Sequence, residues 1–392
     1  MTPAGEAAAG FEFATATRIV FGAGTVAQAG RLAQELGRRP LVVTGANPDR
    51  ARPLLEALAA EKLGHEVFPV PGEPTTLHVA AGVARAELRA CDCVIGFGGG
   101  AAMDAAKAIA GLLTNGGDLY DYLEVVGRGR PLCRAAAPWM AIPTTAGAGA
   151  EVTRNAVLLS REHRVKASLR SPLLLARVAL VDPRLSLSLP PAATAATGLD
   201  ALPQLIEPFT GTRANPLTDA LCRDGLGLVG RSLRRAFHHG HDLAARADMA
   251  LAALFGGLAL ANAGLGAVHG FAAPLGGSFP APHGAVCAAL LAPVMAANLA
   301  ALRARAPESG VPARYAETAR RLTGHADATA EDGVAWVRAL TAELGIPPLR
   351  TYGLREDDLA ALVEKAQAAS SMKANPIALT AGELAGVLRD AL

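Results

Sequence analysis

The hydrophobic pattern of the sequence changes near its middle, and this change limits the folds that the chain can adopt. In the first half, short apolar runs of strand length alternate with longer stretches whose apolar residues repeat at helical spacing. The predicted strands are 41–44, 67–70, 93–97, 140–142 and 178–181, and the predicted helices are 25–36, 50–63, 77–90 and 101–113. This alternation predicts an α/β fold with a doubly wound parallel sheet that is covered by helices on both faces.

The second half lacks this alternation. After Asp182-Pro183 the sequence contains no convincing strand and is typical of successive amphipathic helices separated by Gly and Pro. The Pro190-Pro191 pair marks the joint between the two patterns. We therefore predict an α/β domain over residues 1–189 and an all-helical domain over residues 190–392, a division that a chain of 392 residues can support.

Composition argues against several classes of partner and location. With 37 basic and 35 acidic side chains, the formal net charge is only +2, so we expect no nucleic-acid partner. The five cysteines are scattered and predict neither a disulfide framework nor a thiolate zinc site, so we expect a cytoplasmic protein. Residues 1–10 show no secretory signal pattern. Residues 250–268 are apolar, but glycines and an asparagine dilute them, so we predict a buried helix and no membrane partner.

Three consecutive glycines follow the predicted strand 93–97. Gly98, Gly99 and Gly100 open a predicted helix, so free backbone N–H groups and the positive end of that helix meet where no side chain blocks access. A tight turn would need one glycine, and the triplet therefore favours a phosphate-binding turn. The spacing matches neither the Walker A loop nor G-x-G-x-x-G.

A second loop of small and hydroxylated residues leaves the predicted strand 140–142. It spans residues 142–153 and includes Thr144 and Thr145. Such a loop could surround a ribose or a nicotinamide, although Thr and Gly are also ordinary turn residues. Together with the glycine triplet, the loop indicates a nucleotide site at one edge of the sheet.

Four polar residues of the helical half could converge on one divalent ion. Asp200 and Gln204 are spaced i, i+4 and share one helical face, His269 follows a long apolar helix, and His283 precedes a glycine. For either histidine alone, a structural role in the core or in a loop is the simpler explanation. The prediction of a metal site therefore depends on the four residues meeting in space.

Two local features complete the interpretation of the helical half. Pro203 is tolerated at low cost only in a first helical turn, so the helix with Asp200 is expected to begin close to Leu199 or to be kinked. Residues 234–241 are rich in Arg and His, but their flanks are charged, and we expect a solvated loop without chemistry.

Across nearly its whole length the sequence resembles the iron-containing (group III) alcohol dehydrogenase family, in the superfamily that includes glycerol dehydrogenase and dehydroquinate synthase. The matching segments are Phe21-Gly22-Ala23-Gly24, Gly72-Glu73-Pro74-Thr75, 98–107, 142–153, Lys166-Ala167-Ser168, 197–202, His269, Pro282-His283-Gly284 and Asn375-Pro376. The resemblance implies a nucleotide-binding α/β domain, a helical metal-bearing domain and catalysis in the cleft between them. It also implies that the pyrophosphate lies on the glycine turn and that the residues matching Asp104, Thr144, Thr145 and Lys166 help to hold the cofactor.

The chemistry implied by this resemblance is hydride transfer between a nicotinamide and a small alcohol or carbonyl compound. A divalent ion held by the catalytic residues Asp200, His269 and His283 would act as a Lewis acid on the substrate oxygen. The family normally has His where this chain has Gln204, and an amide oxygen is a weaker ligand, so the ion could be Fe²⁺ or, instead, Zn²⁺ or Mn²⁺. Many relatives also carry a second histidine where this chain has Ala273.

The end of the first predicted strand bears on the choice of cofactor. Many NAD-using relatives carry Asp there, whereas this chain has Gly45, and a missing carboxylate cannot repel a 2′-phosphate. With Arg50 close by in the sequence, NADP(H) is favoured over NAD(H), although Gly45 could simply serve the turn.

The leading hypothesis is therefore a metal-dependent alcohol dehydrogenase, or aldehyde or ketone reductase, that uses NAD(P)(H). One alternative is a metal-independent reductase that resembles maleylacetate reductase, which Gln204 makes reasonable. Others are a cyclase like dehydroquinate synthase and a binding protein without turnover. Relatives are often dimers, so a homodimer is possible.

Overall fold

The sheet at the centre of the α/β part has the strand order β1-β8-β5-β4-β2-β3, and every neighbouring pair is parallel. The computed structural model describes residues 10–163 and 165–392. The strands are β1 (Arg18–Phe21), β2 (Pro40–Thr44), β3 (Glu66–Pro69), β4 (Cys93–Gly98), β5 (Trp139–Pro143) and β8 (Val178–Val181). The prediction of a doubly wound parallel sheet is confirmed, and β1 is a strand that the sequence interpretation omitted.

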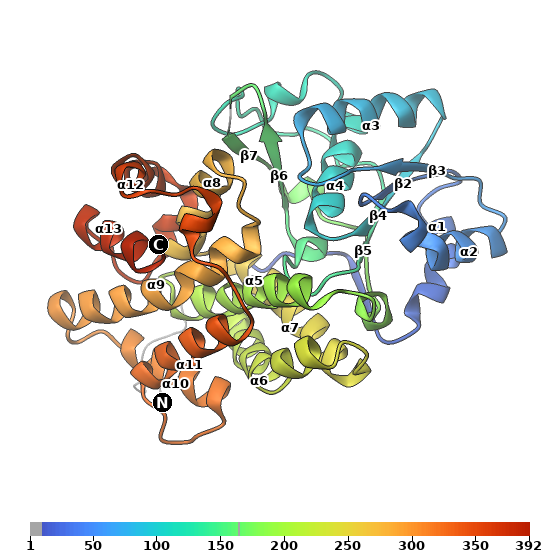
Figure 1. Ribbon diagram of the computed structural model, residues 1–392. Helices are drawn as coiled ribbons and strands as arrows, with labels where there is room; N and C mark the ends of the chain where they lie inside the picture. The colour runs from blue at the N-terminus through green and yellow to red at the C-terminus, as the bar shows by residue number, and fades with distance from the viewer. Residues whose placement is uncertain (1–9, 164) are drawn as a thin grey trace.

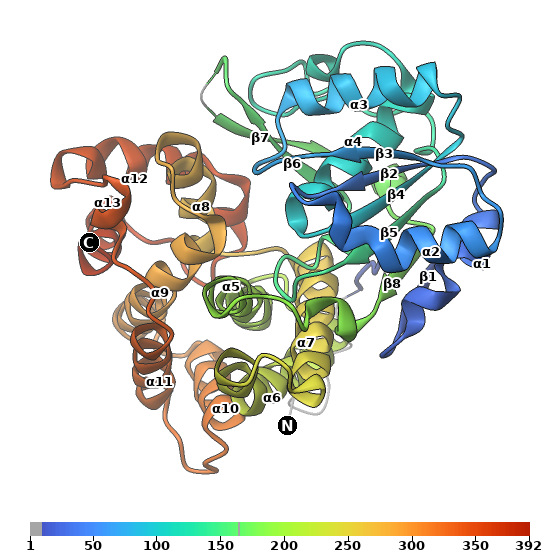
Figure 2. The ribbon, with the colours of Figure 1, turned by 45° about the vertical axis from the view of Figure 1, so that its right-hand side comes forward.

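Helices cover both faces of this sheet (Figures 1 and 2). They are α1 (Ala29–Gln34), α2 (Arg52–Ala60), α3 (Thr76–Leu88) and α4 (Gly100–Asn115). On one face, Leu32 of α1 and Leu54 of α2 join the apolar core of Ile95, whereas on the other Ile109 of α4 joins that of Val94. Because both faces are covered, β2, β4, β5 and β8 are buried along their whole length, which explains their unbroken apolar runs.

A separate antiparallel hairpin stands beside α4. Its strands are β6 (Asn155–Ser160) and β7 (Val165–Arg170), and the sequence interpretation missed both. Buried and half-buried positions alternate along β6, so this strand lacks the continuous apolar run that marks the strands of the main sheet. The hairpin packs against α4 and also against a helix of the second half, so it bridges the two parts.

The second half is helical, as predicted (Figure 1). Its helices are α5 (Pro191–Thr210), α6 (Pro216–His238), α7 (Leu243–Ala263), α8 (Ala267–Ser278), α9 (His283–Arg305), α10 (Val311–Thr323), α11 (Ala330–Glu343), α12 (Leu359–Ala368) and α13 (Ala381–Asp390). Short 3₁₀ helices occur in both halves of the chain. They are η1 (Thr25–Gln28), η2 (Pro48–Ala51), η3 (Leu119–Asp121), η4 (Ala150–Val152), η5 (Pro172–Leu174), η6 (Pro183–Ser186), η7 (Leu349–Tyr352), η8 (Glu356–Asp358) and η9 (Ser370–Ala374). α5 packs against α6, α7 and α9, and its residues from Gly198 to Thr210 are all buried.

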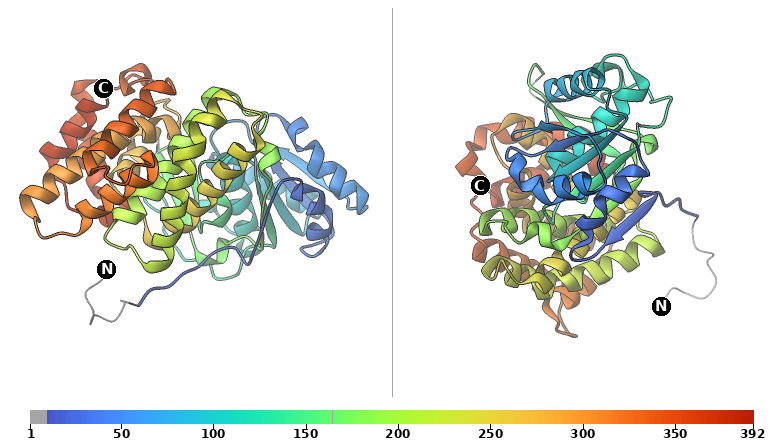
Figure 3. Two further views of the ribbon diagram at one scale, coloured as in Figure 1. Left: turned by 90° about the horizontal axis from the view of Figure 1, so that it is seen from below. Right: turned by 90° about the vertical axis from the view of Figure 1, so that its right-hand side faces the viewer.

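The two halves share apolar contacts. Leu254 and Leu258 of α7 belong to the same apolar core as Val43 and Val94 of the sheet. The chain before β1 also crosses the helical part, where Ala14 N–H donates to Asn262 Oδ1 at 2.7 Å (Figure 3). The predicted division at residues 189 and 190 falls between η6 and α5, but these contacts cross it.

Three local features differ from the expectations. The helix with Asp200 begins at Pro191 and not near Leu199, so Pro203 lies in its interior, where it leaves one helical hydrogen bond unmade; the alternative expectation, a kink, stays a prediction. Burial against three neighbouring helices offsets that cost, which is about 3 kcal/mol. The expected single helix over 250–268 is two helices, because Gly264 adopts a φ of 80° that ends α7.

The third correction concerns the stretch 234–241, which is not a loop throughout. Its first five residues form the last turn of α6, and only from His239 does the chain leave the helix. Arg234 Nε lies 2.7 Å from a carboxylate oxygen of Glu343, and His238 lies 3.2 Å from the other oxygen. Basic side chains at the carboxyl end of a helix also stabilise it by interaction with the helix dipole.

Among the residues that the structure describes, two helices, α7 and α9, are long and apolar enough to cross a membrane. In the fold, 61% of the apolar window of α7 and 78% of that of α9 are buried. Both helices therefore serve as core helices of the protein, which accounts for their composition.

Candidate metal and nucleotide site

Three helices bring four metal-ligating side chains together. Asp200 comes from α5, His269 from α8, and His283 and Cys287 from the first turns of α9. One ligand atom of each lies within 4.8 Å of the others. Nε2 of His283 is 3.4 Å and Nε2 of His269 is 3.9 Å from Oδ1 of Asp200. The structure thus places three of the four predicted ligands in one cluster.

Two buried oxygen atoms in this region have no hydrogen-bond partner among the described residues. They are Oδ1 of Asp200 and Oε1 of Gln204, one helical turn apart on α5. A buried polar atom without a partner costs about 1–3 kcal/mol. Oxygen and imidazole nitrogen atoms are ligands that divalent ions accept, so an ion bound beside Asp200 and the two histidines would satisfy the Asp200 oxygen. The residues present therefore fit the metal that the sequence predicts.

Glu207 controls the orientation of His269. Its Oε2 accepts a hydrogen bond from Nδ1 of His269 at 2.6 Å, and its Oε1 accepts one from the N–H of Val268 at 2.7 Å. This arrangement leaves Nε2 of His269 free to face Asp200. Burial acts to lower the pKa of His269, but the charge and the hydrogen bond of Glu207 outweigh it and raise the pKa above its ordinary value.

Asn375 secures the start of the helix that carries His269. Its Oδ1 accepts from the N–H of Ala267 at 3.1 Å, while its Nδ2 donates to Oδ1 of Asn298 at 2.7 Å. A side chain at Gly266 would approach Oδ1 of Asn375 to 2.8 Å and Oε1 of Glu207 to 3.0 Å. The Asn375-Pro376 segment singled out in the sequence therefore positions α8 and lies outside the ligand cluster.

The glycine triplet lies under the second loop. A Cβ at Gly98 would meet that of Ala102 at 2.8 Å, and one at Gly99 would lie 3.4 Å from the side chain of Thr145. At Gly100 the nearest atom would be Cβ of Ala148, at 3.2 Å. The N–H of Thr144 donates to the carbonyl of Gly98 at 2.8 Å. The turn is therefore open only because it lacks side chains, and the second loop forms its wall.

A fully buried lysine joins α4 to that loop. Nζ of Lys107 donates to the carbonyls of Ala150 and Asn155, at 3.0 and 2.7 Å, and to Oγ1 of Thr153 at 2.9 Å. Burial raises the pKa of Asp104 to about 6, against the opposing charge of Lys107. The sequence interpretation did not assign Lys107 a role.

The second loop also contacts the helical part through backbone. A Cβ at Gly149 would lie 2.4 Å from Cα of Gly257 in α7, and one at Gly147 would lie 2.8 Å from Cβ of Thr197 in α5. Gly149 has a φ of 59°. Glycine at these positions lets the loop that walls the nucleotide turn rest directly on the helix that carries Asp200.

Lys166 lies between the two predicted sites. Its side chain is 6% exposed, and Nζ is 3.0 Å from Oε1 of Glu73. Its positive charge acts on Asp104 beside the glycine turn and also on His283 in the metal cluster. Partial burial of the His283 ring lowers its pKa, and the charge of Lys166 adds to this effect. Lys166 is therefore close enough to both the nucleotide turn and the cluster for its charge to act on each of them.

Gly45 follows β2 next to the glycine turn, and its backbone N is 3.5 Å from the position of a Cβ at Gly98. A Cβ at Gly45 itself would meet nothing within 4 Å. Arg50 lies in η2, where its guanidinium donates to Oγ of Ser188 at 3.2 Å. The end of β2 therefore has room for a larger group.

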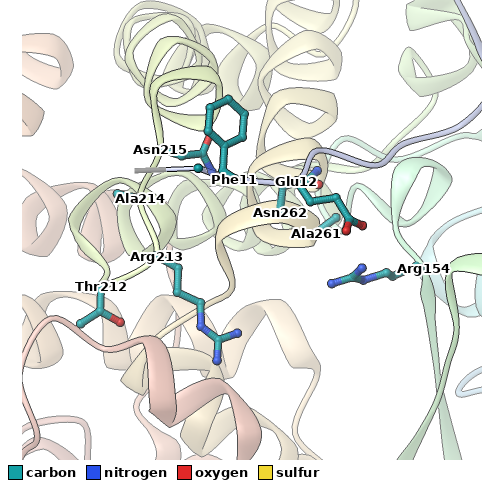
Figure 4. Close-up of a pocket in the computed structure, with 10 residues that line it drawn as sticks. Phe11, Glu12, Arg154, Thr212, Arg213, Ala214, Asn215, Ala261 and Asn262 are labelled. Carbon is teal, nitrogen blue, oxygen red and sulfur yellow. The ribbon is translucent and has the colours of Figure 1, made fainter. Parts of the chain in front are cut away.

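A further pocket of about 460 Å³ lies elsewhere on the molecule (Figure 4). Glu12, Arg154, Arg213 and Asn262 are among its lining residues. It contains none of the residues that the sequence predicts for catalysis, metal or cofactor.

Comparison with known proteins decides the family. A family model described as iron-containing alcohol dehydrogenase matches residues 16–183, and a second, described as the C-terminal part of the Fe-containing alcohol dehydrogenase family, matches residues 194–392. The chain belongs to the iron-containing alcohol dehydrogenase family. The family resemblance drawn from the sequence is thus confirmed.

Relatives support the same assignment. A 1,3-propanediol dehydrogenase of Klebsiella pneumoniae is 34% identical over 388 residues, which cover 95% of this chain and 96% of the relative. The structure of a 1,3-propanediol oxidoreductase has a TM-score of 0.89 and 33% identity, and the match covers 98% of this chain and 100% of that one. A sulfoacetaldehyde reductase from Bifidobacterium kashiwanohense, in complex with NAD⁺, has a TM-score of 0.85 and 27% identity over 98% of this chain and 99% of that one.

As an iron-containing alcohol dehydrogenase, the protein is an oxidoreductase that acts on CH–OH groups with a divalent metal and a nicotinamide cofactor. Its substrates are small alcohols or aldehydes. The alternative resembling maleylacetate reductase is not favoured, because the relatives are alcohol and propanediol dehydrogenases.

The sequence interpretation missed two side chains that contact the predicted ligands. Glu207 follows Asp200 by seven residues, and Cys287 follows His283 by four, so each shares a helical face with a predicted ligand. Helical spacing alone could have suggested both, but a glutamate or a cysteine at such a spacing also occurs for reasons of packing or solvation.

Proposed function

We propose that this alcohol dehydrogenase binds its divalent ion through Asp200, Gln204, His269 and His283. The observation that carries the proposal is the buried Oδ1 of Asp200, which has no other partner among the described residues and faces Nε2 of both histidines. When bound, the ion supplies Lewis acidity to the substrate oxygen. The catalytic residues of the proposal are Asp200, His269 and His283.

The remaining site residues bind the nicotinamide cofactor or hold the site in position. We propose that Gly98, Gly99 and Gly100 accept the cofactor pyrophosphate and that Asp104, Thr144, Thr145 and Lys166 hold its remaining parts. The free N–H groups at the start of α4 and the wall formed by the second loop support this arrangement. Lys107 holds that wall in place, and Glu207 holds the ring of His269. Neither the wall nor the ring therefore needs to move during turnover.

The proposal extends to the choice of nicotinamide. We propose that NADP(H) is used in preference to NAD(H), and that Gly45 lies beside the adenosine ribose. The unfilled space around Gly45 supports this choice, as does Arg50, which is close by in the sequence, because a 2′-phosphate needs room and benefits from a positive charge.

Location and assembly are also proposals. We propose a cytoplasmic protein, which agrees with five free thiols that include the exposed Cys133. A homodimer is proposed as well, since β1 occupies an edge of the sheet and Phe21 at its end is 37% exposed. Light scattering of the purified protein and fractionation of the source cells test these two proposals separately.

The metal mechanism is tested by measuring metal content and turnover in the wild type and in His283→Ala. We expect about one equivalent of a divalent ion in the wild type, with oxidation of NAD(P)H by small aldehydes at 340 nm. The variant should retain its fold, because the His283 side chain is 40% exposed, but should lose the ion and turnover. A variant that is active and fully metal-loaded would contradict the ligand assignment.

A further inference from the structure

Cys287 lies inside the cluster of ligand atoms, although neither the proposed ligand set nor the proposed mechanism uses it. Its Sγ is 3.7 Å from Nε2 of His283 and 3.9 Å from Nε2 of His269. Together with the Asp200 carboxylate, these atoms form the group that spans no more than 4.8 Å. The residue is fully buried, so its sulfur does not lie there as part of a solvated surface.

The position of Cys287 follows from helix geometry. His283 and Cys287 are four residues apart in the first two turns of α9, and side chains at this spacing lie one above the other on the same face. Because His283 faces Asp200, Cys287 must face the same space. Pro282 precedes the helix, and a Cβ at Gly284 would come within 2.1 Å of the carbonyl of Ala196, so α9 is seated directly on α5. This close seating brings the thiol near the carboxylate.

The donor set without Cys287 is weak. Gln204 offers only a neutral amide oxygen, a poorer ligand than imidazole for the divalent ions of the later first-row metals. A thiolate is a strong and soft ligand that favours zinc. Two imidazoles, one carboxylate and one thiolate are four ligands of the kinds that bind zinc in proteins.

We propose that Cys287 binds the ion as a thiolate, so that Asp200, His269, His283 and Cys287 are the four strong ligands and zinc is the preferred metal. This inference rests on the proposed metal centre. When the ion binds, the S–H bond breaks, the proton passes to solvent, and a bond forms between the sulfur and the metal. The amide oxygen of Gln204 then contributes at most a weak additional contact.

Cobalt(II) tests the sulfur ligand directly, because a thiolate bound to cobalt adds a charge-transfer absorption in the near ultraviolet to the weaker visible bands that any bound cobalt produces. The full-length protein is stripped of metal, loaded with one equivalent of Co²⁺ and scanned from the near ultraviolet through the visible. We expect both sets of bands in the wild type. In Cys287→Ser the visible bands should remain and the charge-transfer band should disappear. Cys133→Ser, which removes an exposed thiol, should match the wild type.

The outcomes separate this inference from the proposed metal centre. Visible bands without a charge-transfer band in the wild type would overturn the thiolate ligand but leave the metal centre standing. A charge-transfer band that survives in Cys287→Ser would likewise overturn it. The absence of any bound cobalt in the wild type would overturn both. A wild-type spectrum without the charge-transfer band overturns the thiolate ligand even if a variant fails to fold, and circular dichroism shows whether the variant folds.

Metal competition provides a second readout. Zinc affinity, measured with a chromophoric chelator, should fall about tenfold or more in Cys287→Ser, since even the loss of an outer-shell partner costs about 10–100-fold. Manganese affinity should change much less, because oxygen and nitrogen donors bind that ion without sulfur. Equal losses for zinc and manganese would contradict a direct metal–sulfur bond.

Discussion

The carboxylate of Glu207 and the imidazole of His269 form a buried hydrogen bond of 2.6 Å between residues 62 positions apart in the sequence. Both side chains are at least nine-tenths buried. The bond fixes which ring nitrogen of His269 faces Asp200, and therefore which one is available to a metal.

Replacement of Glu207 by Gln tests this role. The amide oxygen can still accept from Nδ1 of His269, but the NH₂ group cannot accept from the N–H of Val268, and the negative charge that makes the ring a better donor is lost. We expect metal affinity to fall about 10–100-fold, measured by competition with a chelator. Asp248→Asn, which changes a carboxylate bonded to Ser232 and Arg231 in another part of the helical half, is the control and should keep the wild-type affinity. Unchanged affinity in Glu207→Gln would show that the charge does not act on the metal site.

Replacement of Lys107 by Met should destabilise the α/β part. The methionine fills similar volume but leaves the carbonyls of Ala150 and Asn155 without their donor and removes the charge beside Asp104. Breaking a buried charged network of this kind costs about 3–5 kcal/mol, which urea unfolding would detect. Because the second loop loses its anchor, KM for the nicotinamide cofactor should also rise. Lys365→Met, at an exposed position of α12, is the control, and equal stability of the two variants would contradict the anchoring role.

Replacement of Gly45 by Asp tests the proposed cofactor preference. There is space for the side chain, so the fold should be unaffected. A carboxylate at the end of β2 would repel a 2′-phosphate and could accept a hydrogen bond from a ribose 2′-hydroxyl. The ratio of kcat/KM for NADPH to that for NADH should therefore fall, and Gly45→Asn, which adds similar bulk without charge, should lower it less. A ratio that does not move in either variant would place Gly45 away from the ribose.

The stability of the protein should depend on pH through Glu151, a buried residue of the second loop. Burial raises the pKa of Glu151 from 4.5 to about 7, so between these values the folded state binds more protons than the unfolded state. The resulting stabilisation is complete below pH 4.5 and is lost as the pH rises through about 7, with a total of about 3 kcal/mol at most.

Glu151→Gln should remove this contribution. Its free energy of unfolding, measured by urea at several pH values, should therefore fall less than that of the wild type between about pH 5 and pH 8. Asp104, whose pKa is raised to about 6, remains in the variant and should preserve part of the slope. Parallel stability curves for the two proteins would mean that Glu151 is already ionised in the fold at acid pH.

Local sequence patterns determined much of this protein. The apolar run of β4, the glycine triplet after it and the helical repeat of α4 specify a strand, an open turn and a helix without reference to distant residues. In the same way, the spacing of Asp200 and Gln204 placed both on one face of α5. These predictions succeeded because helix and strand periodicity depend on neighbours a few residues away.

Only the tertiary structure decided which faces meet. Nothing local shows that α8 and α9 are seated on α5 so that His269, His283 and Cys287 surround Asp200, or that Glu207 bonds to His269. The position of Pro203 inside α5 was likewise decided by burial, since packing against three helices outweighs a missing hydrogen bond. Long-range packing sets these relationships, because contacts between distant segments form only when each helix buries its apolar face against another.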